Sequence, residues 1–214
     1  MNNKKTAIKA IIFDLGNVLI GFDHRIAVKK IVKHTDMTVR EIYDLFFDSK
    51  LTRSFEEGKM GPVVFFKKIK VLLGLRLSYK EFLPIWNEIF FAKPETEELI
   101  ASLPSHIRLI MLSNINRLHY EYIVSAFPSA INLFGIENII ASFMTGFVKP
   151  AKEIYELAIK KAGIGKGSIV YVDDRQDLIE AASGYGIRSI QFKDTIHLSQ
   201  EFKRLGINAI SQKK

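Results

Sequence analysis

Short runs of branched and other apolar residues recur along this 214-residue chain, and they limit the folds open to it more than any other feature. Runs that are apolar almost throughout are typical of parallel β-strands, because helices cover both faces of a parallel sheet. Five runs fit this description, the last of them less clearly: residues 8–13, 107–112, 169–172, 187–192 and 139–142. We therefore expect a sheet of buried parallel strands.

Segments with helical periodicity lie between these runs. They span residues 95–103, 151–162 and 177–185, and Gly163 and Gly186 follow the last two as helix stops. Alternation of strand and helix predicts an α/β fold with a Rossmann-like, doubly wound parallel sheet. Ligands of such sheets bind outside the carboxyl ends of the strands, so the residues that follow each strand are the candidates for a functional site.

Residues 24–93 interrupt this alternation. They show no convincing strand pattern and contain four amphipathic helical patterns, over residues 26–33, 38–47, 62–73 and 78–90. Two of these begin with a capping box, in which Thr38 precedes Glu41 and Ser78 precedes Glu81. We predict a core formed by residues 1–22 and 94–214, and a helical module over residues 23–93 that is inserted after the first strand.

The composition excludes several classes of protein. The chain has no cysteine, which excludes disulfides, thiol catalysis and cysteine metal sites, and a cytoplasmic location is expected. The formal net charge is +8, but the basic residues are spread along the chain without zinc-finger spacing, so no nucleic-acid partner is expected. Lys9, Asp14 and Asn17 interrupt the apolar N-terminal stretch, so we expect neither a membrane helix nor a cleaved signal.

Polar residues stand at or near the ends of four of the predicted strands. They are Asp14, Ser113 and Asn114, Lys149, and the pair Asp173 and Asp174. Each alone is more common as a turn or helix-cap residue, but one sheet edge would bring all of them together. Converging carboxylates repel each other unless a cation lies between them, and all-oxygen ligands suit Mg²⁺. Asp14 could then attack phosphorus, while Mg²⁺ and Lys149 offset the charge on the transferring group.

These motifs resemble those of the haloacid dehalogenase-like (HAD) hydrolase superfamily, and the resemblance extends over essentially the whole chain. Its carriers are residues 12–19 (IFDLGNVL), 112–114 (LSN), 149–150 (KP) and 172–174 (VDD). The helical insertion lies where that superfamily carries its C1 cap. Residues 13–18 and 113–119 (SNINRLH) are most similar to the branch of the α-D-glucose-1-phosphate phosphatases, which is related to epoxide hydrolase N-terminal domains.

The resemblance implies a role for each of these residues. Asp14 would be the nucleophile, and its second oxygen would bind Mg²⁺ together with the backbone carbonyl of Gly16. Asp174 would supply the metal carboxylate, with Asp173 as a neighbour able to share that role. The phosphate-binding groups would be Ser113, Asn114 and Lys149, and Lys149 would also neutralise the nucleophile.

Two positions depart from the pattern of the superfamily. Most of its phosphatases carry an aspartate two residues after the nucleophile as general acid and base, and here that residue is Gly16, as in the glucose-1-phosphate branch. A carboxylate or amide usually follows the metal carboxylate by four residues, and here Leu178 stands four after Asp174. Asp177 is therefore a candidate for holding the metal's water shell from a different angle.

Three features outside the motifs are further candidates. His119 follows the Ser-Asn motif and could donate a proton, although a packing role is favoured. His24 is a weaker candidate for the same role. Residues 55–58 (FEEG) are predicted to form a loop that could face the active site.

The sequence therefore predicts a Mg²⁺-dependent phosphatase that acts through an aspartyl-phosphate. Its expected substrate is a small phosphorylated metabolite, a sugar phosphate or another easily departing phosphate. No membrane partner is expected, and the chain is expected to be a monomer or a homodimer. Two alternatives stay open: a metal-independent 2-haloacid dehalogenase, and a non-catalytic binding protein that keeps the fold, which only Gly16 and Leu178 favour.

Overall fold

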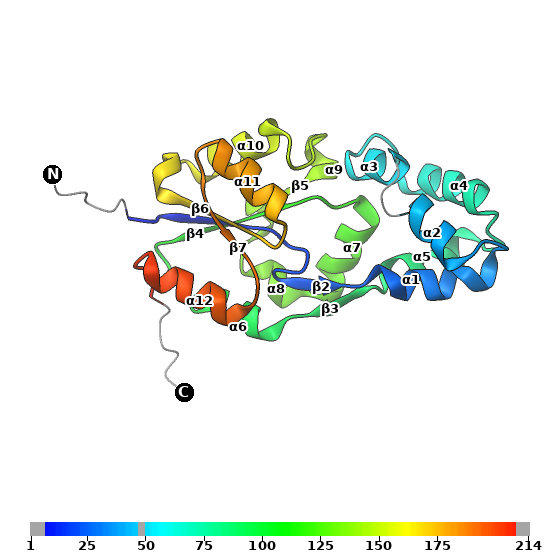
Figure 1. Cartoon of the computed structure of the whole chain (residues 1–214), viewed down its shortest axis with the longest axis horizontal. Coiled ribbons are helices and arrows are strands. Elements are labelled where there is room, and N and C mark those ends of the chain that lie inside the picture. The colour runs from blue at the N-terminus through cyan, green and yellow to red at the C-terminus, as the bar shows by residue number, and fades with distance from the viewer. Residues whose placement is uncertain (1–6, 47–49, 209–214) are drawn as a thin grey trace.

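The computed structural model describes residues 7–46 and 50–208, with a parallel sheet at the centre of the molecule (Figure 1). Its strands are β1 (Ala10–Phe13), β4 (Arg108–Ser113), β5 (Ile139–Ala141), β6 (Ile169–Asp173) and β7 (Arg188–Gln191). They lie in the order β5-β4-β1-β6-β7, and each neighbouring pair is parallel. The five predicted strands and the α/β class are confirmed.

Helices cover both faces of this sheet. The helices α10 (Lys152–Ala162) and α11 (Gln176–Gly184) lie on one side of it in Figure 1, and α6 (Pro94–Ala101), α8 (Pro128–Asn132) and α12 (Thr195–Arg204) lie on the other. The chain continues from β4 into α7 (Arg117–Ala126) and from β5 into the short α9 (Ser142–Thr145). The predicted helices over 95–103, 151–162 and 177–185 correspond to α6, α10 and α11.

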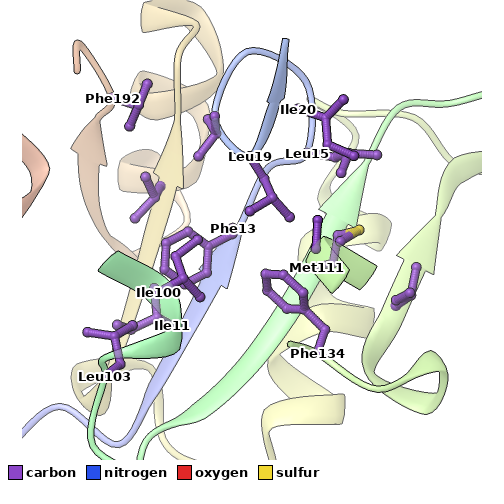
Figure 2. Packing of buried hydrophobic residues seen from close by; sticks show 14 of the residues in the cluster. Ile11, Phe13, Leu15, Leu19, Ile20, Ile100, Leu103, Met111, Phe134 and Phe192 are labelled. Atoms are coloured by element: carbon purple, nitrogen blue, oxygen red, sulfur yellow. The ribbon is translucent and has the colours of Figure 1, made fainter. Parts of the chain in front are cut away.

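Alternate residues of β1 point to opposite faces of the sheet. Ile11 and Phe13 belong to the apolar cluster under α6 and α12, whereas Ala10 and Ile12 belong to the cluster under α10 and α11. Figure 2 shows Phe13 among side chains from several elements, and its ring meets that of Phe134 edge-on at 5.9 Å between centroids. This two-sided burial explains why the strands are apolar throughout.

A short antiparallel ribbon carries the chain out of the core and back. Strand β2 (Ile20–Phe22) pairs with β3 (Phe90–Ala92), with Phe22 opposite Phe90. The predicted helix over 78–90 is therefore too long, since α5 (Tyr79–Asn87) ends before this ribbon. The reason is non-local: residues 90–92 become a strand only because β2 lies beside them, and no local pattern records that pairing.

The inserted module consists of helices with an apolar cluster of their own. They are α1 (His24–Ile31), the 3₁₀ turn η1 (Val32–His34), α2 (Val39–Phe46), α3 (Lys50–Glu56), α4 (Pro62–Leu73) and α5. Phe55, Phe65, Phe82 and Trp86 are buried together in this cluster. Both predicted capping boxes are present, while α3 was not predicted and residue 47 of the predicted helix 38–47 lies outside the described residues. The proposed division between core (1–22 and 94–214) and cap (23–93) stays a prediction, which the separate cluster supports.

His119 joins this cap to the core. Its buried ring stacks on Trp86 with 4.6 Å between centroids, and its Nε2 donates to the backbone oxygen of Trp86 at 3.1 Å. The side-chain oxygen of Asn116 accepts from the His119 backbone N–H, which turns the amide nitrogen of Asn116 towards Nδ1 of the ring at 3.0 Å. Nδ1 therefore has to accept, so the imidazole is neutral and packs rather than donating a proton to a substrate.

Acid is expected to weaken the contact between the cap and the core at His119. Burial lowers the pKa of His119 from 6.5 to about 3, so the unfolded chain binds a proton that the folded chain refuses. The contribution of the neutral His119 to the free energy of unfolding is complete above pH 6.5 and falls by about 1.4 kcal/mol per pH unit from there towards pH 3. Urea unfolding between pH 7 and 4 should show a shallower loss of stability for His119→Gln than for the wild type. Equal slopes for the two proteins would contradict the assignment.

Within the described residues, no helix combines the length and the apolar character needed to cross a bilayer.

Candidate active site

Three neighbouring strands deliver polar side chains to one edge of the sheet. Asp14 directly follows β1, Ser113 ends β4 and Asp173 ends β6. The backbone N–H of Asp14 donates to the Val172 oxygen at 2.8 Å, so the β1–β6 pairing continues up to this carboxylate. Since β4 and β6 flank β1, this edge is the switch point of the doubly wound sheet.

Lys149 bridges two of the carboxylates. Its Nζ donates to Oδ1 of Asp14 at 2.6 Å and to Oδ2 of Asp173 at 2.7 Å, and the ammonium group is almost completely buried. The bond to Asp14 joins residues that are 135 positions apart in the chain, and the bond to Asp173 joins residues 24 positions apart. The lysine predicted to neutralise the nucleophile therefore contacts Asp14 directly.

The cluster carries more negative than positive charge. Asp14, Asp173 and Asp174 each offer an oxygen within 4.8 Å of the others, and Lys149 is the cation that bonds to two of them. Burial, and then the neighbouring carboxylates, raise the pKa of Asp14 to about 7, against the opposing effect of Lys149. Asp14 and Asp173 in turn raise the pKa of Lys149 to about 12 despite its burial. A divalent cation beside these oxygens would balance the charge, and hard oxygen ligands suit Mg²⁺.

The two adjacent aspartates differ in their surroundings. Oδ2 of Asp173 accepts from Lys149 and from the Tyr171 hydroxyl, and Oδ1 accepts from the Arg175 backbone N–H at 2.9 Å. Asp174 is only half-buried and interacts with the Asn17 side chain, while burial and Asp173 raise its pKa. Asp173 is thus engaged through both oxygens, whereas Asp174 borders the cleft.

Asn114 holds the lysine loop in place. Its side-chain oxygen accepts from the Lys149 backbone N–H at 2.7 Å, and its amide nitrogen donates to the Lys149 backbone oxygen at 3.0 Å. The side chain predicted to bind phosphate is therefore committed to the backbone of Lys149, which makes Asn114 a positioning residue. Ser113 is buried and lines the cleft beside it.

The loop after Asp14 passes close to the Phe22 ring at position 16. A Cβ on Gly16 would lie 2.8 Å from the Phe22 ring, while Asn17 takes the left-handed conformation with φ 56°. Asparagine tolerates that region better than most residues do. Gly16 lines the cleft, which is compatible with the predicted role of its backbone carbonyl as a metal ligand. The Phe22 ring occupies the space that a longer side chain at position 16 would need.

Asp177 lies apart from the carboxylate cluster. Its oxygens accept from Arg175 at 2.7 and 3.1 Å in a pair exposed to solvent, and Leu178 lines the cleft instead. This geometry gives no support to a role of Asp177 in holding the metal's water shell.

The cap closes one side of a cleft of about 730 Å³. It contributes His24 from α1 and Lys50, Thr52, Arg53 and Glu56 from α3, facing the carboxylates and Lys149 of the core. Only His24 and Glu56 were among the sequence candidates. No motif marks Lys50, Thr52 and Arg53, because their place depends on how α3 packs rather than on a local pattern.

The comparisons with known proteins agree with this geometry. A family profile described as haloacid dehalogenase-like hydrolase matches residues 8–186. The D-ribitol-5-phosphate phosphatase of Bacteroides thetaiotaomicron is 26% identical over 200 residues, covering 91% of this chain and 96% of that protein. A sesquiterpene phosphatase of Aspergillus oryzae is 24% identical over 212 residues, covering 94% of this chain and 97% of that protein.

A solved structure is similar as well. A HAD family enzyme from B. thetaiotaomicron, solved with magnesium and inorganic phosphate, superposes with a TM-score of 0.77 at 25% identity, and the superposition covers 90% of this chain and 99% of that one.

Proposed function

The chain belongs to the haloacid dehalogenase-like hydrolase family, and from that membership we propose that it is a Mg²⁺-dependent phosphatase of small phosphomonoesters. The observation that carries the proposal is the convergence of Asp14, Lys149 and Asp174 at the carboxyl edge of β1 and β6. The phosphatase relatives from two distant organisms add support.

The residues of the chain divide the reaction into two steps. An oxygen of Asp14 attacks phosphorus and the ester oxygen departs, which leaves an aspartyl-phosphate. Water then attacks this phosphorus and releases phosphate and the free carboxylate. Lys149 holds Asp14 in place and offsets the charge that gathers on the phosphoryl oxygens, and Ser113 lies where it can donate to one of them.

A magnesium ion would be held by Asp14, Asp174 and the backbone carbonyl of Gly16. We favour Asp174 over Asp173 as the metal carboxylate because both oxygens of Asp173 already accept hydrogen bonds. When bound, the ion supplies positive charge that screens the nucleophile from the phosphate.

The lining of the cleft supports a small polar substrate. The cap presents Lys50, Arg53, Thr52 and Glu56 to it, so hydroxyl or anionic groups of a substrate would meet hydrogen-bonding partners. The relatives act on a sugar-alcohol phosphate and on a sesquiterpene phosphate, so family membership alone leaves the leaving group open. A cytoplasmic location and a monomeric or dimeric state stay predictions from the sequence.

The carboxylate cluster separates this proposal from its alternatives. A metal-independent dehalogenase has no use for a third carboxylate, the half-buried Asp174, beside Asp14 and Asp173, because it repels them unless a cation is present. A non-catalytic binding protein would have no need for Lys149 to be held on Asp14 by Asn114.

A substrate screen tests the proposal. The purified protein should hydrolyse 4-nitrophenyl phosphate and several sugar or polyol phosphates with Mg²⁺, and EDTA should remove this activity until Mg²⁺ is restored. Turnover of a 2-haloacid that EDTA does not affect would support the dehalogenase. No turnover of any phosphate ester with Mg²⁺, Mn²⁺ or Co²⁺ would support the binding protein.

A further inference from the structure

The departing oxygen of an alkyl phosphate needs a proton, and the loop after the nucleophile supplies none. Gly16 has no side chain, and the Phe22 ring fills the space above it. Among the core groups, Asp14 is the nucleophile, and the ammonium group of Lys149 is held between Asp14 and Asp173. Asp173 accepts hydrogen bonds through both oxygens and Asp174 is the proposed metal carboxylate, so we look for the proton donor on the cap side of the cleft.

Glu56 lies on that side, at the carboxyl end of α3, and lines the same cleft as Asp14. Two contacts fix this end of α3 against the core. The buried hydroxyl of Ser142 donates to the Glu56 backbone oxygen at 2.7 Å. Gly58 approaches so closely that a Cβ there would lie 2.2 Å from the Phe143 backbone oxygen. The docking of the cap thus holds the backbone of Glu56 against the core, and its side chain lines the cleft.

The charged side chains nearest to Glu56 pair with other residues rather than with its carboxyl group. Arg53 pairs with Glu57 at 3.1 Å and Arg175 pairs with Asp177 at 2.7 Å, and within the described residues the Glu56 carboxyl makes no ion pair or hydrogen bond. The charged and titratable groups around it are Arg53, Glu57 and Arg175, with His24 and Lys50 on the cap side of the cleft and Asp14, Lys149, Asp173 and Asp174 on the core side. Burial outweighs the two arginines and raises the pKa of Glu56 to about 7.

A carboxyl with that pKa is suited to giving and taking a proton near neutral pH, which is the property that general acid–base catalysis needs. His24, the other proton-carrying candidate of the cap, is less suited. Burial lowers its pKa to about 4, so its imidazole is neutral at pH 7 and is a poor acid there.

We propose that Glu56 is the general acid and base of this phosphatase, supplied from the cap. In the first step the P–O bond to the leaving group breaks, its electron pair passes to the leaving oxygen, and the carboxyl proton of Glu56 goes to that oxygen. In the second step the Glu56 carboxylate takes a proton from the attacking water, and the P–O bond to Asp14 breaks. The products are an alcohol and phosphate, and Glu56 is protonated again.

The proposal rests on the proposed phosphatase function, and leaving-group dependence tests it separately. Phenyl phosphate and 4-nitrophenyl phosphate share a ring, but phenolate departs poorly without a proton and 4-nitrophenolate departs well. Glu56→Gln is expected to lower kcat/KM, which reports the step in which the leaving group departs, by about 10²–10⁴-fold on phenyl phosphate and by less than about tenfold on 4-nitrophenyl phosphate. Loss of the base in the second step, which both esters share, should lower kcat on both. The wild-type pH profile on phenyl phosphate should have an alkaline limb that the variant lacks. Glu57→Gln is the matched control, since this neighbouring carboxylate pairs with Arg53 and Lys59 and does not line the cleft.

Each outcome has one meaning. An equal loss of kcat/KM on both esters with the pH profile unchanged would assign Glu56 to substrate binding or folding and overturn the proposal, as would no loss of kcat/KM on phenyl phosphate. If the wild type hydrolyses neither ester with Mg²⁺, the phosphatase function itself fails.

Discussion

Asp14→Asn is expected to abolish phosphatase turnover while leaving the fold intact. The amide cannot attack phosphorus, so the loss should reach roughly 10⁴-fold or more in kcat, the scale seen when a nucleophile is removed. The fold should survive because the change removes one of three crowded carboxylates and leaves Lys149 bonded to Asp173. The measurement is kcat on 4-nitrophenyl phosphate with Mg²⁺, together with the thermal unfolding midpoint.

Asp177→Asn is the matched control for this experiment. It makes the same chemical change at an exposed carboxylate that pairs with Arg175 outside the cluster, so turnover should change little. Hydrolysis by Asp14→Asn at the wild-type rate would reject Asp14 as the nucleophile.

Lys149→Met should damage both catalysis and stability. Removing one partner of a buried ion pair typically costs about 3–5 kcal/mol, and here the methionine would face two carboxylates that lose their shared ammonium group. Turnover should fall with it, because no side chain in the position of Lys149 then offsets the charge on the nucleophile and the phosphoryl oxygens. Because a divalent cation screens the same carboxylates, Mg²⁺ should stabilise Lys149→Met more than it stabilises the wild type.

Two further variants make this result specific. Lys152→Met removes a lysine from an exposed pair with Glu156 on α10 and should leave stability and turnover nearly unchanged. Lys149→Arg keeps the charge, so it should retain much of the stability while its bulkier head displaces Asp14 and lowers kcat. Full activity of Lys149→Met would contradict the role of this ammonium group.

The sheet and the centre of the site could be predicted from the sequence because both produce a recognisable pattern over a few neighbouring residues. A strand buried on both faces has to be apolar throughout, and the polar residue that ends it is then conspicuous. Asp14, Ser113 and Asp173 were found in this way, and strand order brings them to one edge. Lys149 does not end a strand, but it follows the less clear run 139–142 at a short distance, and the resemblance to a family then implied its role.

The parts that were missed depend on pairing between distant segments. Phe90 reads as the end of a helix until β2 lies beside it. Helix α3 places Lys50, Arg53 and Glu56 in the cleft only because Gly58 and Ser142 allow the cap to dock closely on the core. Asn114 was expected to bind phosphate, and its commitment to the backbone of Lys149 follows from a hydrogen bond across 35 residues.

The central claim is that Asp14 takes up phosphorus beside a divalent cation, and trapping the intermediate tests it most directly. The protein would be mixed with a phosphate ester and Mg²⁺, quenched in acid during turnover, digested and examined by peptide mass spectrometry. The phosphoryl group should appear on Asp14 and should be absent when EDTA replaces Mg²⁺. A phosphoryl group on another residue, or a substrate turned over with none on Asp14 at any time, would contradict the account.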